Sequence, residues 1–250
     1  MLRNPGLRKS VEQPVLDLNF AASQIGSNAA PDSRINFSRG TNAWFVDSDG
    51  LVKKSPHNLL TRSEDVSSWT DISRVTVTSN QTTAPDGTLT ADKIAKSAAS
   101  FKYAVNSFTA ATTGDFTVSA YIKAGSLDDV TILISSDNAS TLNGRVVFDL
   151  TNETSTSFSV ALVAKTLTDV GNGWYRATIT TTFSNTTNPR VFVYPGKYDE
   201  TTAGDVFVWG FQVSQHTTLP VDNPYLKTTG SAVYAARLDH DPTWFMSAVQ

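Results

Sequence analysis

Apolar and polar side chains alternate without a break along residues 115–123. Successive side chains of an extended strand point to opposite faces, so this run has one apolar face and one polar face. The apolar face consists of Phe116, Val118, Ala120 and Ile122, and the other face of Thr117, Ser119, Tyr121 and Lys123. A chain with this pattern is predicted to form a β-strand that buries one face in a core.

The same pattern recurs elsewhere between residues 58 and 219. In residues 205–213 it predicts that the core-facing side chains are Phe207, Trp209, Phe211 and Val213. Further strands are predicted at residues 130–134, 145–150 and 158–163. Clusters of Gly, Asn, Asp and Pro separate these runs, which is typical of an all-β protein. Eight or more such strands predict a β-sandwich of two sheets with jelly-roll topology.

Four zones of the chain differ in pattern. Residues 1–33 hold one strand-like run between polar stretches and are interpreted as an extended N-terminal arm. Residues 34–57 predict a β-hairpin, because two apolar runs flank an Asp-Gly turn. The sandwich is assigned to residues 58–219. Residues 220–250 form a C-terminal segment with an apolar Trp-Phe-Met group near its end, which is expected to pack on the hairpin or on a neighbouring subunit.

The composition excludes several classes of partner. The formal net charge is -3 and no basic cluster is longer than Lys53-Lys54, so nucleic acid is not an expected partner. No run of apolar residues has the length of a membrane span or of a signal peptide, so neither membrane insertion nor export is expected. The chain has no Cys, which excludes disulfides and thiolate metal sites.

Residues suited to catalysis are scarce. The three histidines, His57, His216 and His240, fall in predicted loops or near a terminus, and neither a Gly-x-Ser-x-Gly nor a His-Glu-x-x-His motif is found. A Ser-His-Asp triad assembled from distant positions leaves no such motif, so the sequence leaves that alternative open. There are four Glu residues, and Glu64-Asp65 are adjacent, without the separation that glycoside hydrolysis needs. We therefore expect a protein that is not an enzyme, with glycan depolymerisation as the less favoured alternative.

The faces of the predicted strands that point away from the core carry candidate glycan-binding residues. If Val191 and Val193 point inward, their neighbours point outward, and the same holds next to Ala177 and Ile179. This selects a candidate platform of Tyr121, Trp174, Arg176, Phe192 and Tyr194. Aromatic rings bind the apolar faces of sugars, and polar groups beside them bind the hydroxyls. The alternative is that the arm, a loop or a neighbouring subunit covers these rings.

Several motifs together resemble structural proteins of tailed-phage particles. The first are Arg-Ile-Asn-Phe-Ser-Arg-Gly at residues 34–40 and Val-Asp-Ser-Asp-Gly-Leu-Val-Lys at residues 46–53. Another is Ala-Arg-Leu-Asp-His-Asp-Pro at residues 236–242. Between them, residues 58–65 with Trp69, residues 84–93 and residues 171–176 look like a jelly-roll module of those virion proteins that is similar to carbohydrate-binding modules.

The resemblance implies a place on the exterior of a virion, as a tail-fibre or appendage subunit or, alternatively, as a capsid decoration. In the fibre or appendage role, we expect the N-terminal arm to contact other virion proteins and the sandwich either to contact host surface polysaccharide or to act as a spacer. Fibres and decorations are homo-oligomers, commonly trimers, so a homotrimer is expected.

Calcium is the one metal ion for which the sequence offers candidate ligands. Asp47-Ser48-Asp49-Gly50 resembles part of a calcium loop but lacks the later Glu, and a tight hairpin turn explains it better. The resemblance to jelly-roll modules, which often hold a structural Ca²⁺ near the first and last strands, indicates Glu64, Asp65 and Asp205 as candidate ligands. No other metal or cofactor is expected.

Overall fold

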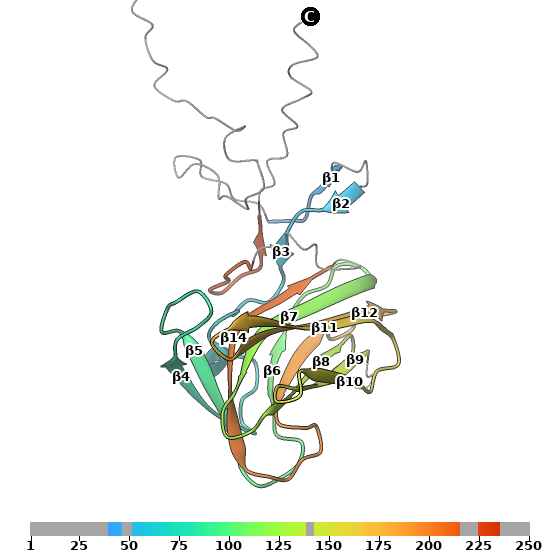
Figure 1. Ribbon diagram of the computed structural model, residues 1–250. Helices are drawn as coiled ribbons and strands as arrows, with labels where there is room; N and C mark the ends of the chain where they lie inside the picture. The colour runs from blue at the N-terminus through green and yellow to red at the C-terminus, as the bar shows by residue number, and fades with distance from the viewer. Residues whose placement is uncertain (1–39, 47–51, 139–142, 216–224, 236–250) are drawn as a thin grey trace, which may run out of the picture. The chain divides into compact units, whose positions relative to one another are not determined.

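The computed structural model describes residues 40–46, 52–138, 143–215 and 225–235 (Figure 1). A six-stranded sheet has the order β11-β12-β7-β14-β5-β4. Its strands are β4 (Thr76–Thr82), β5 (Ala91–Lys96), β7 (Gly114–Ala124), β11 (Leu162–Gly171), β12 (Trp174–Phe183) and β14 (Gly204–Ser214). A five-stranded sheet has the order β10-β9-β8-β13-β6. Its strands are β6 (Ala104–Ser107), β8 (Asp129–Ser135), β9 (Gly144–Asp149), β10 (Thr154–Ser157) and β13 (Arg190–Pro195).

Two small sheets and one short helix complete the described structure. β1 (Trp44–Val46) pairs with β2 (Val52–Lys54), and β3 (His57–Asn58) pairs with β15 (Val233–Tyr234). The 3₁₀ helix η1 (Val66–Ser68) precedes β4. No helix within the described ranges is long and apolar enough to cross a membrane.

The order of the strands is that of a jelly roll. When β5, β6, β7, β8, β9, β12, β13 and β14 are numbered one to eight, one sheet has the order 1-8-3-6 and the other 2-7-4-5. Consecutive strands therefore pass repeatedly from one sheet to the other, as in two interleaved Greek keys. β4, β10 and β11 extend the edges of the two sheets. The predicted all-β, jelly-roll β-sandwich is confirmed.

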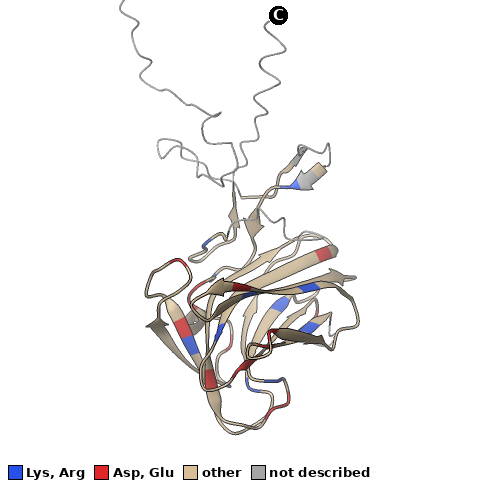
Figure 2. Cartoon of the chain, viewed as in Figure 1, with Lys and Arg blue, Asp and Glu red and all other residues tan. Residues whose placement is uncertain are grey.

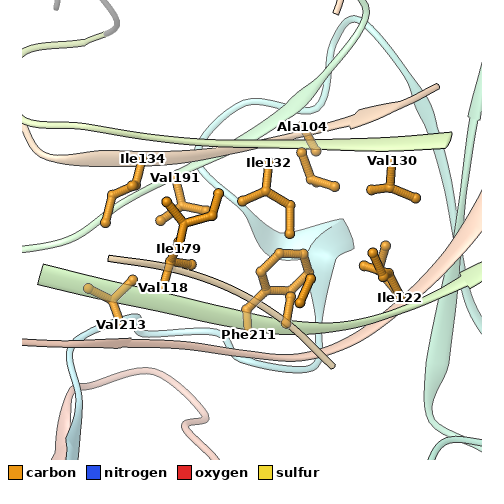
Figure 3. Packing of buried hydrophobic residues seen from close by; sticks show 14 of the residues in the cluster. Ala104, Val118, Ile122, Val130, Ile132, Ile134, Ile179, Val191, Phe211 and Val213 are labelled. Atoms are coloured by element: carbon orange, nitrogen blue, oxygen red, sulfur yellow. The ribbon is translucent and has the colours of Figure 1, made fainter. Parts of the chain in front are cut away.

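The core lies between the two sheets, and the alternation in β7 is as predicted. Phe116, Val118, Ala120 and Ile122 are completely buried in it. Figure 3 shows Ile132, Ile134 and Val191 of the five-stranded sheet pointing toward Val118, Phe211 and Val213 of the six-stranded sheet. Each such aliphatic or aromatic side chain stabilises the fold by about 1.5–3 kcal/mol on burial. The two apolar faces therefore hold the sandwich together.

In β14 the prediction was wrong for the first half of the strand. Val206 and Val208 lie in the core, whereas Phe207 and Trp209 point to the outer face. The register with β7 shifts between Trp209 and Gln212, and Gly210 has a positive φ of 63°. This extra residue is a β-bulge, which reverses the alternation, so only Phe211 and Val213 of the four predicted residues face inward.

The prediction of a strand at residues 158–163 was also wrong. β10 ends at Ser157 and β11 begins at Leu162, so most of this stretch connects an edge of one sheet with an edge of the other. Phe158 and Val160 are 50% and 75% exposed. Their spacing is that of a strand, but no neighbouring layer covers their apolar side.

Parts of the predicted division of the chain lie outside the described residues. These are the arm at residues 1–33, residues 34–39 and 47–51 of the hairpin, residues 139–142 and 216–219 of the sandwich, and residues 220–224 and 236–250. The predictions for His216 and His240 therefore also lie outside the described residues. Within the described part, β1 and β2 pair as a hairpin. Residues 225–235 lie against the same chain, because β15 pairs with β3 and the side-chain Nδ2 of Asn58 donates to the carbonyls of Phe211 and Leu226 at 3.0 and 2.8 Å. The four-zone division itself stays a prediction.

Candidate functional site

The structure does not bring the five candidate platform residues onto one surface. Tyr121 lies on β7, and Trp174 and Arg176 lie on β12, in the six-stranded sheet. Phe192 and Tyr194 lie on β13, in the five-stranded sheet. All five alternate with core residues and point away from the core, as predicted. However, the first three lie on the outer face of one sheet and the last two on the outer face of the other. The prediction that they form a single platform was therefore wrong.

On the six-stranded sheet, the rings are covered by the chain itself. Trp174 and Trp209 are 1% and 3% exposed and belong to one apolar cluster, which we call the tryptophan cluster. The indole nitrogen of Trp174 donates to the carbonyl of Thr83 at 3.0 Å, and that of Trp209 to the hydroxyl of Thr90 at 3.0 Å. The ring of Tyr225 packs 4.6 Å from that of Trp209. The loop between β4 and β5 and the segment that begins at residue 225 therefore close this face against a sugar.

Arg176 lies beside the same cluster. Its guanidinium carbon is 5.7 Å from the centroid of the Tyr121 ring, and its Nε and Nη2 are buried without a hydrogen-bond partner. The residue is half-buried. It thus packs as an arginine stacked on an aromatic ring rather than as part of an open platform.

The outer face of the five-stranded sheet carries a continuous group of rings. Tyr103 packs edge-on against Phe192 and Tyr194, with ring centroids 5.2 and 5.1 Å apart. Tyr198, in the loop after β13, lies 5.1 Å from Tyr194, and Phe101 lies 5.0 Å from Tyr198. We call these five residues the aromatic face. Phe192 and Tyr194 form its buried floor, Tyr103 and Tyr198 are half-buried, and Phe101 is 45% exposed.

Two arginines flank the aromatic face, although charged residues are sparse on the strands of both sheets (Figure 2). The guanidinium of Arg145 is 4.2 Å from the centroid of the Tyr198 ring and 5.2 Å from that of Phe158. The guanidinium of Arg74 is 4.9 Å from the centroid of the Tyr103 ring. Burial raises the pKa of the Tyr194 phenol well above its ordinary value, although both arginines oppose the shift. The Tyr194 hydroxyl therefore stays protonated, and the face combines ring surfaces with hydrogen-bond donors.

A polar pocket elsewhere on the protein has a volume of about 460 Å³. Its lining residues are Arg62, Glu64, Asp65, Ser67, Ser79, Asn80, Thr90, Asp92, Lys227, Thr228 and Thr229. Asp92 is the buried carboxylate of this polar pocket, and it accepts the backbone N–H groups of Val66 at 2.9 Å and Asn80 at 3.1 Å. Burial, reinforced by the charges of Asp65 and Glu64, raises the pKa of Asp92 to about 6.

The other carboxylates of the polar pocket also bind the protein's own groups. Glu64 accepts the hydroxyl of Tyr225 at 2.9 Å and pairs with Lys227 at 2.5 Å. Asp65 accepts the hydroxyls of Ser67 at 2.6 Å and Ser68 at 2.5 Å. Asp65 thus stabilises the turn of η1, and Glu64 holds the segment from residue 225 against the chain before η1.

The three candidate calcium ligands are not brought together. Glu64 and Asp65 line the polar pocket. The residue before them, Ser63, accepts the backbone N–H of Phe211 of β14 at its carbonyl. Asp205 lies six residues before Phe211, which is roughly 20 Å along β14 at the rise of a strand. There its carboxylate accepts the amide of Ser126 at 3.2 Å. Within the described residues, no group of three or more His, Asp or Glu side chains is arranged to hold a metal ion.

Comparison with known proteins adds little to this geometry. No family model matches the chain, and no curated protein matches it. Among solved structures, it is similar to a "putative sugar binding protein" from Bacteroides thetaiotaomicron VPI-5482, with 11% sequence identity and a TM-score of 0.35. The likeness covers 64% of this chain and 95% of that one. At this TM-score it supports no inference about function.

Sequence reasoning missed three rings of the aromatic face, Phe101, Tyr103 and Tyr198, and the two arginines beside it, Arg74 and Arg145. For Arg145 a signal existed, because it alternates with Val146 and Phe148 on a predicted strand and must point outward where Val146 points inward. Tyr198 lies in a loop, and no local periodicity indicates where a loop side chain lies.

Proposed function

We propose that this protein binds glycans, without catalysis, on the aromatic face of its five-stranded sheet. The observation that carries the proposal is the partly exposed set of rings, Phe101, Tyr103 and Tyr198, resting on a buried floor. Rings held by packing against other rings lose little conformational entropy when a sugar stacks on them. The arginines beside them supply donors for sugar hydroxyls.

The polar pocket supports a non-catalytic role. A carboxylate that acts as general acid or base must be free to reach a bound substrate. Both oxygens of Asp92 instead accept backbone amides, and Glu64 binds Tyr225 and Lys227. These are the contacts of structural cross-links. A depolymerase would reduce the viscosity of a host polysaccharide mixed with the purified protein, and we expect no such loss.

The test is binding of the full chain to a glycan array, followed by titration with the best ligand. Replacing Tyr198 by alanine removes a stacking surface, so we expect affinity to fall by about tenfold or more. Trp44→Ala is the matched control, because Trp44 is 63% exposed and lies on β1, outside the aromatic face. Binding that Tyr198→Ala leaves unchanged, or an array without any ligand, would contradict the proposal.

We further propose that the protein is a tail-fibre or appendage subunit on the exterior of a phage particle, assembled as a homotrimer. The support is the resemblance of the motifs at residues 34–40, 46–53 and 236–242 to phage structural proteins. Copy number in purified particles tests the position, because symmetric fibres need on the order of a few tens of chains and capsid decorations on the order of hundreds. Hundreds of copies would favour decoration, and absence from the particle would refute both roles.

A further inference from the structure

Arg145 is a cation held in a fixed position beside the aromatic face. It lies on β9 directly opposite Leu133 of β8, whose other neighbour across the sheet is Phe192. Its guanidinium is stacked near the rings of Tyr198 and Phe158, at 4.2 and 5.2 Å from their centroids. Its Nε is buried without a hydrogen-bond partner. Cation–π contacts of this kind hold the planar group in place without using its donors.

No carboxylate neutralises this arginine within the described residues, where the ion pairs join Arg62 to Asp65, Lys197 to Asp129 and Lys227 to Glu64. Arg74, the other arginine of the face, differs because its charge acts on Asp71, whose pKa is lowered chiefly by hydrogen bonds from Ser73 and also by Arg74 and Arg190. A partly buried charge without a partner is unfavourable, so Arg145 has donors that an anionic ligand would satisfy.

We propose that Arg145 binds the carboxylate of an acidic sugar, so that the ligand of the aromatic face is a polysaccharide containing uronic acid or a similar acid. This inference rests on the proposed glycan-binding function. A guanidinium presents paired N–H donors that match the two oxygens of a carboxylate, while the neighbouring rings accept the apolar face of the pyranose. The whole chain carries a net charge of -3, so general attraction of a polyanion is not expected and binding has to arise from a local site.

The test compares polygalacturonate with the same polymer after reduction of its carboxyl groups, by titration of the full chain. We expect the reduced polymer to bind about tenfold more weakly or worse, which is the scale of one charge-assisted interaction. Arg145→Gln should weaken binding of polygalacturonate by a similar factor and weaken binding of the reduced polymer much less, because that polymer keeps hydroxyls for Arg145 to bind but has no carboxylate. Arg145→Lys keeps the charge but not the paired donors, so its affinity for polygalacturonate should lie between those of the wild type and of Arg145→Gln.

Arg176→Gln is the matched control, because Arg176 is also a half-buried arginine stacked on a tyrosine, but on the opposite sheet. It should leave both affinities unchanged, and thermal melting of each variant checks that it is folded. Equal affinity for the two polymers, with both losing affinity in Tyr198→Ala, would overturn the acidic-sugar inference and leave the glycan-binding function standing. Equally tight binding of dextran sulfate would also overturn it, since charge alone would then suffice. Failure to bind any polymer or array glycan would refute both.

Discussion

Replacing Gly210 by alanine should destabilise the protein through the bulge in β14. Gly210 has a φ of 63°, and in this left-handed region a residue with a Cβ costs about 1–2 kcal/mol more than glycine. The new Cβ would lie 2.9 Å from Cδ2 and 3.3 Å from Cε2 of Tyr121. That ring cannot move away freely, because it packs between Trp209, Tyr225 and Arg176. Overpacking of this kind adds about 1–3 kcal/mol, so we expect a total loss of about 2–5 kcal/mol.

The assay is urea denaturation of the wild type and of two glycine variants. Gly87→Ala is the matched control, because Gly87 also has a positive φ, of 86°, but a Cβ there would meet no atom within 4 Å. It should lose only the backbone contribution, about 1–2 kcal/mol. The difference between the variants measures the contact with Tyr121. Equal losses in the two variants would refute the close approach of the Tyr121 ring to Gly210 on the outer face of β14.

Two further predictions concern stability. The raised pKa of Asp92, about 6 against an ordinary 3.8, means that the folded state binds this proton more tightly than the unfolded state. The stability due to protonated Asp92 should therefore be complete below pH 3.8 and lost as the pH rises through about 6, a change of about 3 kcal/mol. Asp92→Asn should remove this part of the pH dependence of urea denaturation, whereas the control Asp199→Asn, at an exposed position, should not. An unchanged pH profile in Asp92→Asn would contradict the assignment of this pH dependence to Asp92. Phe211→Ala should reduce stability by about 3–5 kcal/mol, because Phe211 is completely buried against Trp69. The control Leu89→Ala should change stability by about 0.5 kcal/mol or less, because Leu89 is 63% exposed. Similar losses in the two variants would contradict the assigned core.

The fold class could be predicted from the sequence because each strand carries its own evidence of which side is buried. β7 shows this directly, since its four predicted core residues are all completely buried. The prediction failed where the alternation alone was ambiguous. In β14 an apolar residue occupies nearly every position from Val206 to Phe211, and only the bulge at Gly210 decides which set faces the core. At Phe158 and Val160 the spacing is right, but no layer covers it.

The candidate site was less predictable, because it depends on which chain segments cover each sheet. Local periodicity placed Trp174 and Tyr194 correctly on outer faces, but it does not indicate that Trp174 binds the carbonyl of Thr83, far away in the chain. It also does not indicate which sheet an outer face belongs to, so residues from β12 and β13 were grouped wrongly. Tyr198 and Arg145 meet only in the folded protein, through the loop after β13.

Mapping a bound glycan by NMR chemical shifts tests the central claim most directly. In a titration with a ligand selected on the array, we predict that the largest changes fall on Phe101, Arg145 and Tyr198, with smaller changes at Tyr103. Signals from the tryptophan cluster should stay in place. Changes centred on Trp174 and Trp209, or on the polar pocket around Asp92, would contradict a binding site on the five-stranded sheet.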